Sequence, residues 1–409
     1  MNFDIMIVGG GPAGLSAAKR AAQLGCKVAL FEKSKEIGYP IHTSGGSWID
    51  ELEKLGVPTK FIHPIKRGEF VTNKSKAIFK YRTSPSCILD VRGYYQYLAE
   101  QASLTGTEIF VNATVVDPIV SDDFVRGVSV NINGKRYNIY SKIVIDASGF
   151  NAIIARKVGL LDKFKVYGIG AEYELVAPSW DQEKVCFIFS NKIAPAGYGW
   201  IFPRGNSRVR VGIAIIHPIS KASPVKCLDA FLSSDNKIAK HLKPYSKIEF
   251  HQGFIPNDGV LPKAVYNGLI VVGDAAGQIS AIVGEGIRFA VDIGDIAGLV
   301  AAKAVSNKKY SEDFLVDYEK RWREKYELKF KIAYEINKRL RSYTDEDWDE
   351  KVKILSHLSP DLLVDFLKGN FSTGFFFKAI RQQPKLVSNT IFKMIKQMLG
   401  TNVRKRVST

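Results

Sequence analysis

Residues 4–14 read Asp-Ile-Met-Ile-Val-Gly-Gly-Gly-Pro-Ala-Gly, a short apolar strand that runs directly into Gly9-x-Gly11-x-x-Gly14. Residues 15–24 then favour a helix, and residues 27–32 form a second apolar run that ends in Glu32. Strand, glycine loop, helix and strand in this order predict a β-α-β unit that holds a dinucleotide. The alternative is a glycine-rich turn without a ligand, but it gives no reason for the acid at the end of the second strand.

Each residue of this motif has a physical role in the predicted site. Gly9 permits the tight turn, Gly11 lets the backbone approach a pyrophosphate, and Gly14 lets the helix pack closely on the strand. The helix N-terminus offers free N–H groups and the positive end of its dipole to the phosphates. Glu32 follows at about the 20-residue distance expected of the acid that accepts hydrogen bonds from a ribose.

A second motif lies much later in the chain. Residues 268–277 form an apolar strand ending in Gly273-Asp274, and Val283-Gly284-Glu285-Gly286-Ile287 then enters a helix-like run. With the first motif, these residues resemble the two-part signature of the flavoprotein class that includes aromatic hydroxylases and geranylgeranyl reductases. The resemblance implies non-covalent FAD, with Asp274 at its ribityl and pyrophosphate region. It also implies that the turn at Gly284 and Gly286 places a helix N-terminus against the flavin ring.

An aromatic motif separates these two regions. Residues 195–203 read Pro-Ala-Gly-Tyr-Gly-Trp-Ile-Phe-Pro, so Tyr198, Trp200 and Phe202 share one face of a strand. An aromatic core strand is the alternative, but the bracketing prolines and the intervening glycines favour a cavity wall. The run resembles the PxxYxWxFP motif of geranylgeranyl reductases, which implies a pocket that positions an isoprenoid chain beside the flavin. The implied substrate-binding residues are Pro195, Tyr198, Trp200, Phe202 and Pro203.

The resemblance implies further cofactor contacts and has two departures. Thr43 stands where many relatives carry a cysteine, so a catalytic thiol is not expected there, and residues 278–283 lack a proline that is common in that loop. Arg92 matches an arginine that lies near FAD in the family, the alternative being a surface helix arginine. The further residues implied at the cofactor are Pro12, Ala13, Lys33, Ser44, Gly45, Gly46, Arg92, Val115, Gly149 and Ile287.

The resemblance implies saturation of C=C bonds in geranylgeranyl chains, as in archaeal enzymes that act on digeranylgeranylglycerophospholipids. Reduced flavin would deliver a hydride to one alkene carbon, and a proton would reach the other. Tyr198, His42 and ordered water are the candidate proton sources. The external reductant is left open. The alternatives are NAD(P)H, a quinol, and an electron-donor protein such as ferredoxin.

Two other functions compete with this one. Flavin-dependent halogenases and monooxygenases share the fold, and halogenases carry a WxWxIP run. Here Tyr198 replaces the first Trp, and Phe202 replaces the Ile, and both differences favour the reductase. A non-catalytic prenyl-lipid binder or electron carrier would bind flavin and lipid without saturating the chain.

The expected architecture is α/β, with a Rossmann-type FAD-binding domain of the aromatic-hydroxylase type. It comprises residues 1–165 and 264–305, including a hairpin over 66–81 for which the substrate side is the alternative place. Residues 166–263 read as an inserted antiparallel sheet that forms the substrate domain. Residues 306–409 are expected to be helical and basic.

Charge and composition limit the partners. The chain has 58 basic and 41 acidic residues, a net charge of +17, but no nucleic-acid-binding motif. We therefore expect an anionic membrane surface as partner and a cytoplasmic, peripheral location, without a signal peptide or a spanning segment. Four scattered cysteines predict no metal site. The basic tail after Asp365, with Phe375-Phe376-Phe377 as an apolar wedge, is the expected anchor; the alternative is a helix packed on its own protein.

Overall fold

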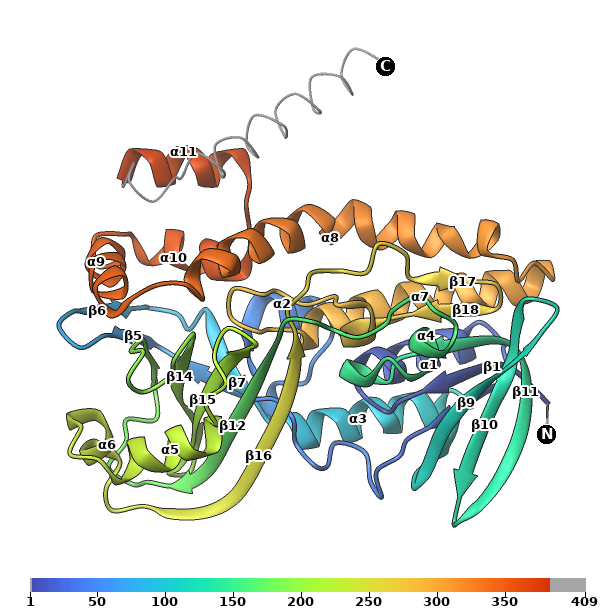
Figure 1. The fold of residues 1–409 in the computed structure, drawn as a ribbon, viewed down its shortest axis with the longest axis horizontal. Coiled ribbons are helices and arrows are strands. Elements are labelled where there is room, and N and C mark those ends of the chain that lie inside the picture. The colour runs from blue at the N-terminus through green and yellow to red at the C-terminus, as the bar shows by residue number, and fades with distance from the viewer. Residues whose placement is uncertain (1, 383–409) are drawn as a thin grey trace.

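Two β-sheets, one toward each end of the longest axis, organise the fold (Figure 1). The structure, a computed structural model, describes residues 2–382. The sheet near the N-terminus is mixed, and its centre is parallel. Its strands are β1 (Asn2–Val8), β2 (Val28–Phe31), β8 (Glu108–Phe110), β9 (Ala113–Ser121), β10 (Phe124–Ile132), β11 (Lys135–Asp146), β17 (Val265–Tyr266) and β18 (Leu269–Val271).

The parallel part of this sheet has the order β18-β11-β1-β2-β8. Strands β2 and β18 are buried along their whole length, as expected of parallel strands covered on both faces. Strands β9 and β10 extend the sheet as an antiparallel meander with β11, and β17 pairs antiparallel with β18. The carboxyl ends of β1, β11 and β18 therefore lie next to one another, where a dinucleotide binds in this type of fold.

Two helices lie against each other beside this sheet: α1 (Pro12–Gln23) and α7 (Ile287–Asn307). A Cβ atom on Gly294 or Gly298 would lie 2.4 Å from the carbonyl oxygens of Ala13 and Ala17, respectively. The two helix backbones are thus in direct contact, which connects the first motif to the second. The remaining helical segments of this region are α3 (Val91–Leu104), α4 (Ile153–Lys157), η1 (Thr59–Phe61), η2 (Gly149–Asn151) and η3 (Gly273–Ala276).

The second sheet has seven strands in the order β16-β12-β15-β14-β13-β5-β6. All pairs are antiparallel except β13 with β5, where the hairpin β5–β6 joins the sheet. The hairpin expected over 66–81 thus lies on the substrate side. The strands are β5 (Arg67–Val71), β6 (Lys76–Lys80), β12 (Tyr167–Val176), β13 (Lys184–Ile188), β14 (Gly197–Gly205), β15 (Arg208–His217) and β16 (Ser246–Pro256).

The two faces of this sheet differ. Helices α5 (Pro224–Ser233) and α6 (Lys237–Leu242) cover one face with an aliphatic core that includes Ile201, Val211 and Leu228. The other face carries Trp200 and Phe202. Strands β3 (Gly46–Trp48), β4 (Ile62–Ile65) and β7 (Ser86–Leu89) form a small third sheet, and α2 (Ile49–Lys54) follows β3. Ile65 and Ile88 of this sheet belong to the same aromatic cluster.

Helix α8 (Glu312–Leu340) runs above the two large sheets in Figure 1, from the first sheet toward the second. It leads into α9 (Asp345–Leu355), α10 (Pro360–Lys368) and α11 (Thr373–Gln382). Ile332 and Ile336 of α8 pack with Leu362 and Leu363 of α10 and with Phe70 of the hairpin. Within residues 2–382 no helix has the length and apolar character to cross a membrane.

The expectation of a Phe375-Phe376-Phe377 wedge is wrong for two of its members. Phe375 and Phe376 are 8% and 4% exposed and pack against Phe371, whereas Phe377 is 70% exposed. The reason is helical geometry, because consecutive residues of α11 point in directions about 100° apart. The basic residues from Lys385 onward, which belong to the region 306–409 expected to be helical, lie outside the described residues.

Candidate active site

The loop between β1 and α1 is a tight turn fixed by backbone contacts. Gly9 has a φ of +108°, and its N–H donates to the carbonyl oxygen of Phe31 at 2.8 Å. A Cβ on Gly14 would lie 2.1 Å from the Gly9 carbonyl oxygen, so α1 packs directly on the turn. The Glu32 carboxylate accepts a hydrogen bond from the Gly10 N–H at 2.7 Å and holds the loop from the other side.

Gly11 faces open space. Apart from Gly11 itself and its two chain neighbours, no atom of residues 2–382 lies within 4 Å of the point that a Cβ on Gly11 would occupy. Gly11 is also the N-cap of α1 and provides no side-chain cap, so the first N–H groups of the helix remain available to an anion. These features fit the pyrophosphate of FAD, which would be held by Gly11, Pro12 and Ala13.

A cavity of about 350 Å³ extends from this loop to the seven-stranded sheet. Its wall combines residues from both sequence motifs and from the aromatic motif. The predicted cofactor residues on this wall are Gly11, Pro12, Ala13, Ser44, Gly45, Gly46, Gly149, Gly273, Asp274, Gly284, Gly286 and Ile287. Segments more than 270 residues apart in the sequence therefore form one site.

Other predicted cofactor residues lie outside this wall: Gly9, Gly14, Glu32, Lys33, Arg92 and Val115. Gly9, Gly14 and Glu32 shape the loop, as described above. Arg92 is exposed and pairs with Glu36 at 2.9 Å, and Val115 is buried within β9. A contact of Lys33, Arg92 or Val115 with FAD stays a prediction.

Asp274 is the ionisable group at the junction of the two motifs. Its side chain is partly exposed to the cavity, and a Cβ on Gly286 would lie 3.4 Å from its Oδ1. Enclosure by protein raises the pKa of this carboxyl to about 6. A carboxyl in this place fits the hydroxyl groups of a ribityl chain, to which it can accept hydrogen bonds in its charged form.

Glu285, between the two turn glycines, anchors the turn. Its carboxylate accepts hydrogen bonds from Ser47 Oγ at 3.0 Å, Trp48 Nε1 at 3.1 Å and Arg288 Nε at 2.9 Å. Arg288 Nη2 donates in turn to the carbonyl oxygen of Lys368 in α10 at 2.8 Å. The turn that faces the predicted flavin position is thereby fixed to β3 and to the C-terminal helices.

The aromatic motif forms the opposite wall. The ring centroids of Tyr198 and Trp200 are 5.8 Å apart, and those of Trp200 and Phe202 are 6.3 Å apart. All three side chains line the cavity, whereas Pro195 and Pro203 do not. Pro203 follows Phe202 on the strand, so its side chain points to the other face; a substrate contact of either proline stays a prediction.

Glycines make room for the Trp200 indole. A Cβ on Gly212 would lie 2.2 Å from Trp200 Cζ2, and one on Gly170 would lie 3.6 Å from Trp200 Cη2. The indole Nε1–H donates to Glu172 Oε2 at 2.7 Å, which fixes the orientation of the ring. The large flat side chain therefore lies against bare backbone, with one face directed to the cavity.

The two candidate proton donors have different surroundings. The Tyr198 hydroxyl donates to the carbonyl oxygen of Val283 at 2.8 Å, and burial raises the pKa of this phenol. Its hydroxyl proton is therefore engaged in this hydrogen bond and is only weakly acidic. His42 is exposed at the cavity wall, and its Nδ1 lies 2.7 Å from the carbonyl oxygen of Gln252.

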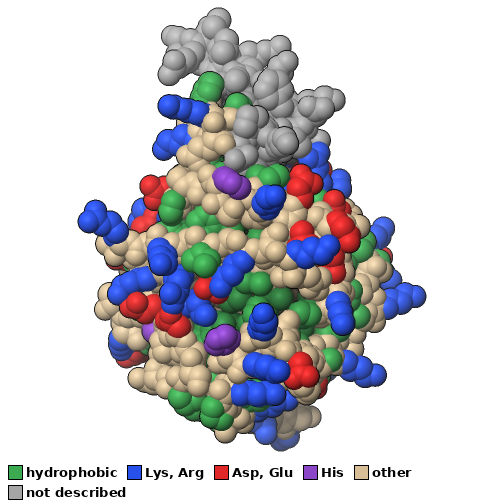
Figure 2. Space-filling model, turned by 90° about the vertical axis from the view of Figure 1, so that its left-hand side faces the viewer, with side chains coloured by type: hydrophobic (Ala, Val, Ile, Leu, Met, Phe, Trp, Pro, Cys, Tyr) green, Lys and Arg blue, Asp and Glu red, His purple; other side chains and the backbone are tan. Residues whose placement is uncertain are grey.

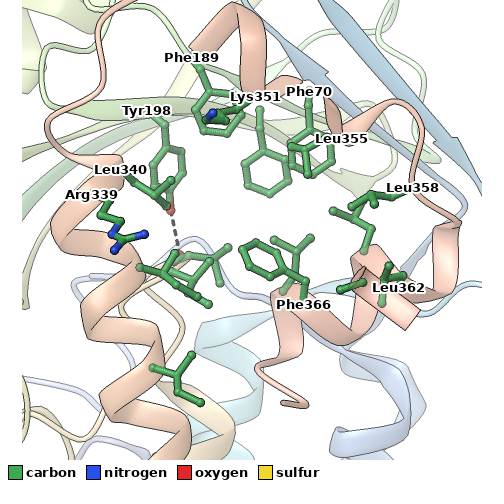
Figure 3. Close-up of a pocket in the computed structure, with 18 of the residues that line it drawn as sticks. Phe70, Phe189, Tyr198, Arg339, Leu340, Lys351, Leu355, Leu358, Leu362 and Phe366 are labelled. Atoms are coloured by element: carbon green, nitrogen blue, oxygen red, sulfur yellow. Dashed lines mark hydrogen bonds between the residues drawn. The ribbon is translucent and has the colours of Figure 1, made fainter. Parts of the chain in front are cut away.

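A second cavity of about 300 Å³ continues from the first beneath the C-terminal helices. In Figure 3, Phe70, Phe189, Tyr198 and Phe366 surround it, and Arg339 and Lys351 are its basic residues among those labelled. The two cavities share the wall residues Phe70, Phe187, Tyr198, Val283, Leu363 and Leu367. A mostly apolar space thus leads away from the flavin side of the site.

Buried charges lie beside the aromatic residues, on the same face of the seven-stranded sheet. Glu172, Glu174, Arg210 and His251 have side chains that are at most 4% exposed. Arg210 Nε contacts Glu174 Oε2 at 3.2 Å, and Arg210 Nη1 donates to the Ser44 carbonyl oxygen at 2.8 Å. The charge layer therefore connects the substrate sheet to the Ser44-Gly45-Gly46 loop.

The comparisons with known proteins agree with this geometry. Residues 4–160 match the FAD dependent oxidoreductase family, and residues 167–254 match the geranylgeranyl reductase catalytic domain. The digeranylgeranylglycerophospholipid reductase of Methanocaldococcus jannaschii is 35% identical over 361 residues, which cover 86% of this chain and 90% of that protein. This chain belongs to the geranylgeranyl reductase family. It is accordingly an FAD-dependent oxidoreductase.

Further relatives support the same family. The digeranylgeranylglycerophospholipid reductase of Methanosarcina acetivorans is 33% identical, over 90% of this chain and 93% of that protein. A geranylgeranyl bacteriochlorophyll reductase-like structure from Thermoplasma acidophilum has a TM-score of 0.85 at 25% identity, and covers 96% of this chain and 99% of that one. A flavin-dependent brominase has a TM-score of 0.72 at 16% identity, which shows a shared fold alone. The predicted fold class and family are confirmed.

Several residues of the site were not among those predicted. Glu172, His251 and Glu285 line the cavity, as do Trp48 and Cys87. The sequence contained one signal for the buried charges. Glu172 and Glu174 are two residues apart in one strand, and Arg208 and Arg210 are two residues apart in another. In the paired strands β12 and β15, Glu174 lies opposite Arg210. Opposite charges at matching periods on neighbouring strands indicate a buried ion-pair layer rather than a solvated face.

Proposed function

We propose that this reductase saturates C=C bonds in the geranylgeranyl chains of an archaeal-type membrane lipid. One observation carries the proposal: Tyr198 stands where the glycine-lined cofactor cavity opens into the apolar cavity under the C-terminal helices, and Trp200 and Phe202 line the cofactor cavity next to it. An extended isoprenoid chain fits an elongated apolar space of this kind. Both digeranylgeranylglycerophospholipid reductases described above act, by their names, on a digeranylgeranylglycerophospholipid.

The residues of the chain have distinct tasks in the proposed reaction. FAD, when bound and reduced, supplies the hydride. Gly11 and the N-terminus of α1 hold its pyrophosphate, and the Gly284–Gly286 turn orients the end that faces the substrate. Trp200 and Phe202 hold an alkene of the chain against that end, and their ring faces stabilise positive charge that develops on an alkene carbon. Closely packed aromatic walls exclude water from the reacting atoms.

The direct test is anaerobic incubation of the holoenzyme with dithionite and geranylgeranyl lipids of several headgroups, followed by mass spectrometry. Each saturated bond adds about 2 mass units, from one hydride and one proton. Lipids that remain unchanged would contradict the reductase proposal. Substrate-dependent oxygen uptake would instead favour the monooxygenase or halogenase chemistry of this fold, and lipid binding without either reaction would favour a carrier.

We also propose that the enzyme works at an anionic membrane surface. The support is the net charge of +17 and a sequence in which no acidic residue follows Asp365. Each basic residue close to an anionic surface contributes about 1 kcal/mol. Full-length enzyme should sediment with anionic liposomes, less so at high salt, and a truncation before Pro384 should keep FAD but lose sedimentation. Equal sedimentation of both proteins would exclude this tail as the anchor.

The external reductant is proposed to be NAD(P)H, a ferredoxin or a quinol. Its identity is decided by mixing the oxidised holoenzyme with each donor under anaerobic conditions and following the loss of flavin absorbance. The donor that reduces the flavin and supports lipid saturation without dithionite is the physiological class. A donor that reduces the flavin without supporting saturation would be excluded.

A further inference from the structure

Glu172, His251 and Glu249 form a continuous hydrogen-bonded row from the cavity to the protein surface. His251 Nδ1 lies 2.9 Å from Glu172 Oε1, and His251 Nε2 lies 3.0 Å from Glu249 Oε2. We propose that this row supplies the proton for alkene saturation, with Glu172 as the group that transfers it and His251 as the group that stores it. The inference rests on the proposed function and names the proton route within the same site.

The cavity end of the row is at the aromatic wall. Glu172 and His251 both line the cavity, and Glu172 also accepts the indole N–H of Trp200. Trp200, which would position the alkene, is therefore hydrogen-bonded to Glu172, which would protonate it. A donor within hydrogen-bond reach of the reacting group is the first requirement for general acid catalysis.

The other end of the row reaches solvent. The side chain of Glu249 is 38% exposed, whereas those of Glu172 and His251 are each 4% exposed. Glu249 also accepts a hydrogen bond from Arg208 Nη2 at 2.7 Å, which fixes it beside the imidazole. A proton lost on the cavity side can be replaced from water at Glu249 without opening the cavity.

Charge balance favours the imidazolium form of His251. The row itself contains the carboxylates of Glu172 and Glu249, and those of Glu174 and Asp90 lie in the ion-pair network around it. The cations of this network are Arg204, Arg208 and Arg210. Four acids face three arginines, so a protonated His251 makes the layer neutral. Burial opposes this charge, but the adjacent carboxylates outweigh it and raise the pKa of His251.

The same charges argue against a metal ion. The ligand atoms of Glu174, Glu249 and His251 lie within 4.8 Å of one another. However, Glu174 is already paired with Arg204, Arg208 and Arg210. A divalent cation at this place would stand among three guanidinium groups and a charged imidazole, where repulsion opposes its binding.

The proposed step is balanced. His251 passes its Nδ1 proton to Oε1 of Glu172, and the neutral carboxylic acid gives a proton to one alkene carbon. The electron pair of the π bond forms the new C–H bond there, while the other carbon receives the hydride and its two electrons from the reduced cofactor. Neutral His251 keeps its proton on Nε2. Its ring therefore turns to bring the bare Nδ1 to Glu249, takes up there a proton that comes from water, and turns back to restore the starting state.

The test uses reduced holoenzyme and a geranylgeranyl lipid in anaerobic single turnovers, with flavin reoxidation and lipid mass as readouts. We expect E172Q and H251Q to slow the turnover by about 10²-fold, the lower range for loss of a general acid, while FAD content stays unchanged. H241Q is the matched control, because His241 lies on α6 and outside both cavities, and it should keep the wild-type rate.

The pH dependence separates a proton-storing role from a structural one. The wild-type rate should fall as pH rises through the raised pKa of His251, and this fall should be absent from the residual rate of H251Q. A wild-type rate and pH profile in H251Q would overturn the proposal. If wild-type enzyme saturates none of the lipids, the proposed function itself fails, which is a different result.

A second readout does not depend on turnover. In histidine-labelled holoenzyme, the NMR signal missing from H251Q identifies His251, and its titration should lie above the ordinary histidine pKa of 6.5. The E172Q variant should shift that titration toward lower pH because it removes one carboxylate. A His251 that stays neutral above pH 5 in the wild-type enzyme would contradict the storage role.

Discussion

The cofactor half and the substrate half of the cavity are built in different ways. The cofactor half uses backbone: Gly9, Gly11 and Gly14 form its loop, and the first turn of α1 presents main-chain N–H groups. The substrate half uses side chains, with Trp200 and Phe202 next to the buried charges Glu172, Arg210 and His251 on one face of the sheet. The glycine loop of the first half is determined by residues close together in sequence, whereas the second half is determined by contacts between distant strands. Perturbations should therefore separate binding of FAD from reaction with the lipid.

The largest expected effect is in the cofactor half, where two glycines of one loop should respond differently. Gly11→Val should abolish FAD binding, because the new side chain would occupy the pyrophosphate's position, but the apoprotein should fold, since that position is open. Gly14→Val should instead destabilise the fold, because its Cβ would meet the Gly9 carbonyl oxygen at 2.1 Å. Flavin absorbance and thermal unfolding check both results. Colourless wild-type protein after incubation with FAD would overturn the comparison.

The next effect belongs to the substrate half. Gly212→Ala should leave FAD bound but reduce lipid saturation at least tenfold. The new Cβ would lie 2.2 Å from Trp200 Cζ2, a clash that forces the indole out of its position. Gly170→Ala is the matched control, since its Cβ would make an ordinary contact with the same ring at 3.6 Å. Flavin content and turnover are measured for each variant. Equal activity of the two variants would show that the position of the indole does not limit the reaction.

Tyr198→Phe should have a smaller effect. It removes the hydrogen bond to the Val283 carbonyl oxygen and should cost about 1 kcal/mol of unfolding free energy. Turnover should fall by less than tenfold, because the phenol is not the proton source in the proposed route. Denaturant unfolding and single-turnover rates measure the two quantities. A loss of turnover as large as that of Glu172→Gln would restore Tyr198 as the proton donor.

The smallest effect is a dependence of stability on pH. The pKa of His251 is raised in the folded protein, so its contribution is complete below the unfolded value of about 6.5 and is lost as pH rises through the folded pKa. The free energy of unfolding should therefore decline over that window in the wild-type protein more than in His251→Gln. Urea titrations at several pH values provide the measurement. Parallel declines in both proteins would assign the dependence to another group.

The same difference explains what the sequence could predict. Local sequence determines the glycine loop, Glu32 and the Gly273–Asp274 turn. Their motifs therefore predicted the β-α-β unit and predicted that the second motif contacts the same cofactor. The aromatic strand was predicted because alternation places Tyr198, Trp200 and Phe202 on one face. Glu172 and His251 lie on separate strands, and only the pairing of β12 with β16, which sets Glu172 opposite His251, reveals the pair. The inward turn of Phe375 and Phe376 likewise depends on where α11 packs.

Helix α8 has a consequence for how this family can change in evolution. The helix begins at Glu312, whose N–H donates to Asn267 beside the first sheet, and it ends at Leu340 in the wall of the apolar cavity. Its wall residues Ile332, Ile336 and Leu340 recur every fourth position and share one face. One inserted residue between the ends would rotate that face by about 100° and advance it by about 1.5 Å. Single insertions or deletions in α8 should therefore be rare, whereas changes in the loops that follow it can alter the length of the cavity.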